Sequence, residues 1–106
     1  MQETVLVYTT WPRLTDAEQA GRALVEAKLC ACVNILPGMV SIYAWRGAVE
    51  RAGEVVMILK TRRARLEALM EAVRAAHPYD TPAILELPVG LVDPRYAAWI
   101  AAETAP

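Results

Sequence analysis

Two segments of this chain are apolar at every position, and they constrain its fold more than any other feature. The runs Val55-Val56-Met57-Ile58-Leu59 and Val5-Leu6-Val7-Tyr8 have the composition of strands. They lack the alternation expected of a sheet with one face in water. Both faces of the predicted sheet therefore need cover. A chain of 106 residues forms one domain, residues 1–106, with no elements to spare. We infer that another copy of the chain covers one face.

The order of the predicted elements narrows the fold class. Strands are expected at about 3–10, 31–45, 54–61 and 84–89, and helices at about 15–28, 64–76 and after Asp93-Pro94. Thr15 and Glu18 have the spacing of a capping box. Pro37-Gly38 is expected to interrupt the second strand, and Arg46-Gly47 to form a hairpin turn. The order predicts an α+β, ferredoxin-like split β-α-β sandwich: a four-stranded antiparallel sheet with two helices on one face, here with a short C-terminal helix.

Charge and composition argue against several functional classes. The chain has 11 basic and 12 acidic residues, so no general basic surface for nucleic acid or an anionic membrane is expected. No apolar run approaches the ~20 residues of a membrane span, and no glycine-rich phosphate loop is present. No signal-type segment precedes the first strand, which favours a cytoplasmic location. Cys30 and Cys32 are expected to be free thiols there.

His77 is the single histidine and the first candidate for any chemistry, because imidazole titrates near neutrality and is the commonest metal ligand. It falls at the end of the second predicted helix, directly before Pro78. Two interpretations stay open. The residue could cap or pack against the helix end, where a histidine complements the helix dipole, or it could bind a ligand.

The two cysteines are the other candidates. In an extended segment Cys30 and Cys32 would share one face and could approach one soft metal ion, while the competing interpretation makes them small buried apolar residues. Cys-x-Cys lacks the four ligands of a closed zinc site, so a site shared between chains stays open. A Cys32 nucleophile with His77 as base is the third alternative, with only Asp80 to orient the imidazole.

Several motifs together resemble the CutA divalent-ion tolerance family. They are Ala31-Cys32-Val33-Asn34-Ile35, Pro37-Gly38, Ser41-x-Tyr43-x-Trp45-x-Gly47, Leu59-Lys60-Thr61, His77-Pro78-Tyr79-x-x-Pro82 and Tyr96-x-x-Trp99-Ile100. The resemblance covers nearly the whole chain in the correct order. It implies a ferredoxin-like fold assembled as a PII-like homotrimer, and a role in the response to copper and other divalent metals without enzymatic activity. No cofactor is obligatory, and His77 and Cys32 are the metal-ligand candidates.

Three positions depart from the members of that family with a proposed copper site. Thr9 stands where such members carry a cysteine, Ala76 where they carry a second histidine, and Ala83 where glutamate is usual. The expectation is therefore weak copper binding. The alternative function is a signalling or interaction trimer, in which His77 and Tyr79 line a subunit cleft for a small effector or a protein partner.

Overall fold

Four antiparallel strands form the centre of the molecule, and the computed structural model describes residues 3–106. The strands are β1 (Thr4–Trp11), β2 (Cys32–Trp45), β3 (Ala48–Arg62) and β4 (Ile84–Pro88), and the helices are α1 (Leu14–Glu26), α2 (Leu66–Ala76) and α3 (Pro94–Glu103), with a 3-10 turn at Arg63–Arg65. The sheet order is β2-β3-β1-β4. This is the predicted ferredoxin-like arrangement, because α1 and α2 each connect two strands that are consecutive in the chain but not neighbours in the sheet.

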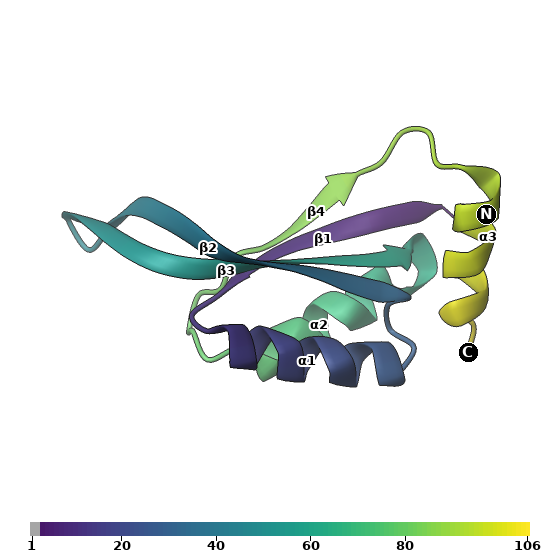
Figure 1. Ribbon diagram of the computed structural model, residues 1–106, viewed down its shortest axis with the longest axis horizontal. Helices are drawn as coiled ribbons and strands as arrows, with labels where there is room; N and C mark the ends of the chain where they lie inside the picture. The colour runs from purple at the N-terminus through teal and green to yellow at the C-terminus, as the bar shows by residue number, and fades with distance from the viewer. Residues whose placement is uncertain (1–2) are drawn as a thin grey trace.

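Helices α1 and α2 cover one face of the sheet (Figure 1). Strand residues that point toward them are fully buried at Val5, Val7, Met57 and Leu59. The helices contribute Ala17, Ala20, Leu24, Leu66, Leu69 and Val73 to the same core. The alternation of side chains along a strand sets this pattern, since every second residue faces the helices.

One local expectation is corrected and another is confirmed. Helix α1 begins at Leu14 with Arg13 as its N-cap and without a side-chain cap hydrogen bond, so Thr15 lies inside the helix and no capping box forms. The interruption at Pro37-Gly38 is confirmed, because the pairing of β2 with β3 shifts register between Leu36 and Met39 and β2 continues on both sides. Gly38 has a φ of +86° there, which glycine adopts at little cost. The extra residues are accommodated as a β-bulge.

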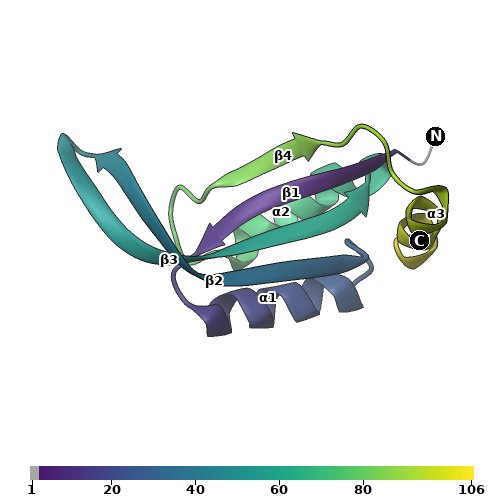
Figure 2. The ribbon, with the colours of Figure 1, turned by 45° about the horizontal axis from the view of Figure 1, so that its top comes forward.

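The hairpin of β2 and β3 reaches well past the rest of the sheet (Figures 1 and 2). The pairing of β1 with β3 ends at Trp11 and Val55, so residues 39–54 pair only with each other, and we call this segment the arm. Its turn at Arg46-Gly47 is confirmed, with φ values of +50° and +83° that suit a two-residue hairpin loop. Apolar side chains on the arm are largely exposed, including Ile42 at 71% and Val49 at 78%.

The face of the sheet opposite α1 and α2 also exposes apolar side chains. Leu36 and Leu85 are more than half exposed, at 53% and 54%, and Leu87 is 37% exposed. The register places Leu85 beside Tyr8 and Leu87 beside Leu6 on this helix-free face. No element among residues 3–106 covers it, apart from α3 at one end (Figure 1). The helix-free face therefore carries apolar side chains that no element of the described residues covers, and cover by another copy stays a prediction.

Helix α3 lies at the end of the sheet remote from the arm (Figure 1). Its predicted start is confirmed, because the Asp93 side chain accepts hydrogen bonds from the amides of Arg95 and Tyr96. Ile100 is buried, while Tyr96 and Trp99 keep 38% and 42% of their surface exposed. No helix among residues 3–106 combines the length and apolarity needed to cross a bilayer.

Candidate functional site

His77 is buried at the end of α2 and forms structural contacts with both ring nitrogens. It is 8% exposed, and its Nε2 lies 2.7 Å from the carbonyl oxygen of Thr10. The amide of Tyr79 donates to Nδ1 at 3.1 Å. Because a carbonyl oxygen only accepts and an amide only donates, the ring carries its proton on Nε2. Neither nitrogen is left with a lone pair directed at a ligand.

An aromatic stack fixes the His77 ring in place. The imidazole lies against the indole of Trp11, with ring centroids 4.2 Å apart. The indole nitrogen donates to Thr9 Oγ1 at 2.7 Å, and Thr9 in turn donates to the carbonyl of Met57 at 2.7 Å. Of the two interpretations of His77, packing at a helix end describes this geometry. Thr9 is fully buried on the helix-covered side, so that position does not face a ligand.

The two cysteines lie in different environments and do not share a face. Cys30 precedes β2 and is 1% exposed in the core, where burial, with a smaller effect of Cys32, raises the pKa of its thiol to about 12. Cys32 is the first residue of β2 and is half-buried. Its Sγ lies 3.6 Å from the hydroxyl of Tyr96. A neutral buried thiol is a poor metal ligand, because the thiolate is the form that binds.

Lys60 completes the surroundings of Cys32. Its ammonium donates to the Tyr96 hydroxyl at 3.0 Å and lies 5.3 Å from the centre of the Tyr96 ring. The hydrogen bond with Tyr96 raises the pKa of Lys60. Strand β3 and helix α3 therefore place one cation beside the Cys32 thiol, which is the more accessible of the two cysteines.

Within one chain the fold keeps Cys32 and His77 apart. Cys32 pairs with Lys60, and Lys60 pairs with Leu6, whereas His77 bonds to Thr10. Leu6 and Thr10 are four residues apart along β1, roughly 14 Å at the rise of an extended strand. The Cys32–His77 nucleophilic pair is therefore not assembled, and His77 interacts with the Tyr79 amide instead of Asp80.

A single chain does not bring together enough ligand side chains for a metal ion. Among residues 3–106, no group of three or more His, Cys, Asp or Glu side chains lies close enough to hold a metal ion. Ala76 and Ala83 provide no ligand atoms on either side of His77. The residues of a single chain consequently do not form a multidentate site for copper or zinc, which usually take three or four protein ligands.

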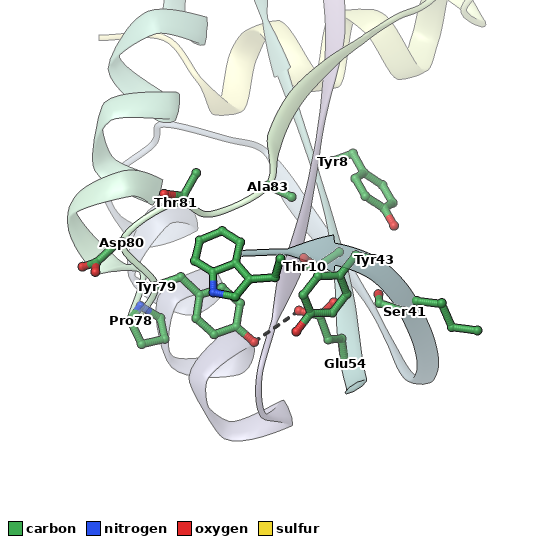
Figure 3. Close-up of a pocket in the computed structure, with 12 residues that line it drawn as sticks. Tyr8, Thr10, Ser41, Tyr43, Glu54, Pro78, Tyr79, Asp80, Thr81 and Ala83 are labelled. Carbon is green, nitrogen blue, oxygen red and sulfur yellow. Dashed lines mark hydrogen bonds between the residues drawn. The ribbon is translucent and has the colours of Figure 1, made fainter. Parts of the chain in front are cut away.

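A cavity of about 720 Å³ lies on the helix-free face, where the arm meets the segment after His77 (Figure 3). It is lined by side chains from β1, the arm and the loop before β4, among them Tyr8, Tyr43, Trp45, Glu54, Tyr79 and Asp80. The hydroxyl of Tyr79 donates to Glu54 Oε2 at 3.2 Å. Burial, followed by the charge of Glu54, raises the pKa of Tyr79.

The sequence interpretation found part of this cavity and missed its carboxylate. Tyr79 lines this cavity of the single chain, whereas the buried His77 is not among the lining residues, and the expected cleft between subunits stays a prediction. Glu54 was missed, because a charged residue before an apolar strand usually marks the strand's end. The available signal was alternation: Glu54 has the same parity as Val56 and Ile58 and therefore shares the helix-free face with them.

The fold, the long arm and the His77-Pro78-Tyr79 motif at the end of α2 define a small ferredoxin-like protein. The family model described as CutA1 divalent ion tolerance protein matches residues 5–103. This chain belongs to the CutA1 divalent ion tolerance family.

Individual relatives are similar in sequence or structure over most of this chain. The divalent-cation tolerance protein CutA of Thermus thermophilus is 40% identical over 104 residues, covering 98% of this chain and 99% of that protein. The CutA homolog of Xenopus laevis is 43% identical over 93 residues, covering 88% of this chain and 62% of the relative. The crystal structure of CutA1 from Ehrlichia chaffeensis superposes with a TM-score of 0.95 at 34% identity, covering 100% and 99% of the two chains.

The relatives differ in length. This chain spans 62% of the Xenopus laevis protein and 52% of protein CutA from Mus musculus. It spans nearly all of the bacterial relative from Thermus thermophilus. The shared part is therefore the ferredoxin-like domain.

Proposed function

We propose that this chain acts as a homotrimer in the response to and tolerance of divalent metal ions, copper among them. Membership of the divalent ion tolerance family carries this proposal. The role is not enzymatic, because the family is described by tolerance, and the two groups suited to nucleophilic chemistry, Cys32 and His77, have separate partners. The decisive experiment compares growth in copper of cells with and without the intact gene. Equal growth at every copper concentration would contradict the role.

Assembly is the part of the proposal with the most direct physical support. The helix-free face exposes Leu36, Leu85 and Leu87, and the arm exposes Ile42 and Val49. Exposed apolar area of this kind is typical of surfaces that pair with another chain. The number three comes from the resemblance to the family. Sedimentation equilibrium tests it directly, and a stable monomer at micromolar concentration would overturn it.

Direct copper binding, in this proposal, is weak. A copper ion at His77 must replace one of the two hydrogen bonds that hold the ring. Cys32 and His77 can bind the same ion only if they come from two different subunits. Calorimetric titration of the assembled protein with copper and zinc tests this, using Cys32→Ser and His77→Ala beside the native chain. Binding that persists unchanged in both variants would exclude these residues as ligands.

The proposed location is the cytoplasm, and two free thiols support it. Cys30 and Cys32 form no disulfide, and unpaired cysteines are typical of reducing compartments. Relatives differ in this respect: one solved homologue, from Archaeoglobus fulgidus, is described as periplasmic, and the homologue from Arabidopsis thaliana as chloroplastic. Cell fractionation decides the question for this chain, and recovery outside the cytoplasm would refute the assignment.

A second candidate function is favoured by the cavity beside Tyr79. In this alternative the trimer is a signalling or interaction protein that binds a small effector or a partner at a subunit cleft. The cavity of about 720 Å³ supports it, because its size lies in the range of small-molecule sites. A thermal-shift screen of metabolites distinguishes the alternative from the metal role, since an effector would raise the midpoint of unfolding in the absence of metal.

A further inference from the structure

We propose that the hydrogen bond between Tyr79 and Glu54 is a brace that holds the arm in the orientation in which copies of this chain assemble. The arm joins the rest of the sheet at a hinge, and the brace fixes that hinge before the copies meet. This inference rests on the proposed homotrimer, and it names the residue that prepares the arm for assembly.

The hinge lies where both strands of the arm are weakened. On the β2 side the register shifts between Leu36 and Met39, and a bulge of this kind bends its strand. On the β3 side Gly53 pairs with Val40, and no atom beyond its chain neighbours lies within 4 Å of the place where a Cβ would stand. Crowding therefore does not require glycine there, and a glycine inside a strand weakens the strand. Figure 2 shows the arm turning away from the direction of the other strands at this junction.

Little else fixes the direction of the arm. Past the end of β1 it has no third strand, and a two-stranded ribbon is only marginally stable by itself. Within residues 3–106, two side-chain hydrogen bonds link the arm to the rest of the chain. One runs from the Tyr79 hydroxyl to Glu54 Oε2 at 3.2 Å. The other runs from the Tyr8 hydroxyl to the sulfur of Met39 at 3.6 Å. A thioether is a weak acceptor, so the Tyr79 bond is the stronger polar link across the hinge.

Tyr79 is held firmly on the side of the hinge away from the arm. Its amide donates to His77 Nδ1 at 3.1 Å, and the two rings lie 4.9 Å apart. His77 is itself buried against Trp11, and Pro78 has a restricted φ. The hydroxyl of Tyr79 therefore meets Glu54 from a fixed position (Figure 3). A hydrogen bond to a carboxylate is also stronger than one between neutral groups.

The orientation of the arm matters because its exposed apolar side chains, Ile42 and Val49 among them, belong to the proposed assembly surface. An arm that moves between two orientations presents this surface correctly for only part of the time. Association weakens in proportion to that fraction, and a segment that is already ordered loses less entropy on binding. The brace should therefore act on assembly more than on the folding of one chain.

The expected size of the effect follows from one hydrogen bond. The loss of one such bond shifts an equilibrium about fivefold. A hinge divided equally between two orientations without the brace is then about five-sixths in the braced orientation with it. Because the first step of assembly joins two chains, and both need a braced arm, the assembly rate should fall about threefold when the brace is removed.

The test measures the assembly rate of Tyr79→Phe, which keeps the ring and removes the hydroxyl. The unfolded full-length chain is diluted from guanidinium chloride at several protein concentrations, and light scattering follows assembly. We expect the concentration-dependent phase to slow about threefold, while the concentration-independent folding phase stays unchanged. Tyr43→Phe is the matched control, because it removes the same atom from an arm residue whose hydroxyl forms no hydrogen bond within residues 3–106. It should assemble at the native rate.

Variants of Glu54 test the other end of the brace. Glu54→Ala should slow assembly as much as Tyr79→Phe does, whereas Glu54→Gln keeps an acceptor oxygen and should retain most of the native rate. The double variant Tyr79→Phe with Glu54→Ala should be no slower than either single variant, since one bond is lost only once.

The outcomes separate the brace from the assembly itself. Sedimentation of the refolded product first establishes its oligomeric state. An assembled product with equal rates for Tyr79→Phe and the native chain would overturn the brace and leave the homotrimer standing. Equal slowing by Tyr43→Phe, or additive slowing in the double variant, would also overturn the brace. A native chain that refolds to a monomer without a concentration-dependent phase would overturn the homotrimer, and the brace with it.

Discussion

Replacement of His77 distinguishes most clearly between a packed residue and a ligand. His77→Ala removes the Nε2 bond to Thr10, at 2.7 Å, the acceptor for the Tyr79 amide, at 3.1 Å, and the stack on Trp11, at 4.2 Å between centroids. Each hydrogen bond contributes about 1 kcal/mol net, and an aromatic pair adds about 1 kcal/mol. The free energy of unfolding should therefore fall by about 3 kcal/mol.

His77→Phe is the matched variant, because it keeps a ring against Trp11 and loses only the two hydrogen bonds. We expect a loss of about 2 kcal/mol, from the Thr10 carbonyl and the Tyr79 amide left without partners. Urea unfolding at one fixed protomer concentration measures both variants, since the stability of an oligomer depends on concentration. If both variants stay within about 0.5 kcal/mol of the native protein, the structural role assigned to His77 is wrong.

Three further predictions concern the thiol, the C-terminus and the arm. Between pH 9 and pH 12 the unfolded chain releases the Cys30 proton while the folded chain, with a pKa of about 12 against an ordinary 9.0, retains it. The stability that the buried thiol contributes is therefore fully present below pH 9 and is lost as the pH rises. Between pH 8 and pH 10 the free energy of unfolding, measured with urea, should fall by about 1 kcal/mol more for the native protein than for Cys30→Ala. If the two proteins show the same change of stability with pH, the thiol of Cys30 is not buried as described. Arg62 is buried and donates to the Thr104 hydroxyl at 3.0 Å and to the Thr104 carbonyl at 2.9 Å. Arg62→Met should therefore lower the free energy of unfolding by about 2–3 kcal/mol. Thr104→Val should lower the free energy of unfolding by less than Arg62→Met does. A larger loss for Thr104→Val would contradict the role given to Arg62. Ile42→Asp on the arm should shift sedimentation toward smaller species, whereas Leu14→Asp on α1, also exposed, should not; unchanged sedimentation of Ile42→Asp would exclude the arm from the interface.

The fold could be predicted from the sequence because each element has a local signal. Continuous apolar runs marked the strands, and Asp93-Pro94 marked the start of α3. The helix start at Thr15 was predicted wrongly, since a capping box depends on the backbone conformation of its first residue, and the chain enters α1 at Leu14. The interruption at Pro37-Gly38 was predicted correctly, since Pro-Gly is a strong local signal, and a bulge absorbs these residues while the strand continues on both sides.

The candidate site was less accessible from the sequence. Its residues come from β1, the arm and the segment after α2, and pattern analysis has no means of showing that Glu54 meets Tyr79 across 25 residues. The same limit applied to Cys32 and His77. Both are reactive residue types, and only the register of β1, β2 and β3 revealed how far apart a single chain holds them.

By itself, the sequence determined the α+β class, the order of the elements and the need for a second apolar cover. These features follow from the spacing of apolar residues along the sequence, because side chains repeat every two residues in a strand and about every 3.6 residues in a helix. The tertiary structure decided which side chains meet. It buried the imidazole of His77 between Thr10, Tyr79 and Trp11, and it placed Glu54 among tyrosine rings. Contacts of this kind depend on strand register and on the course of the arm, which are properties of the whole sheet.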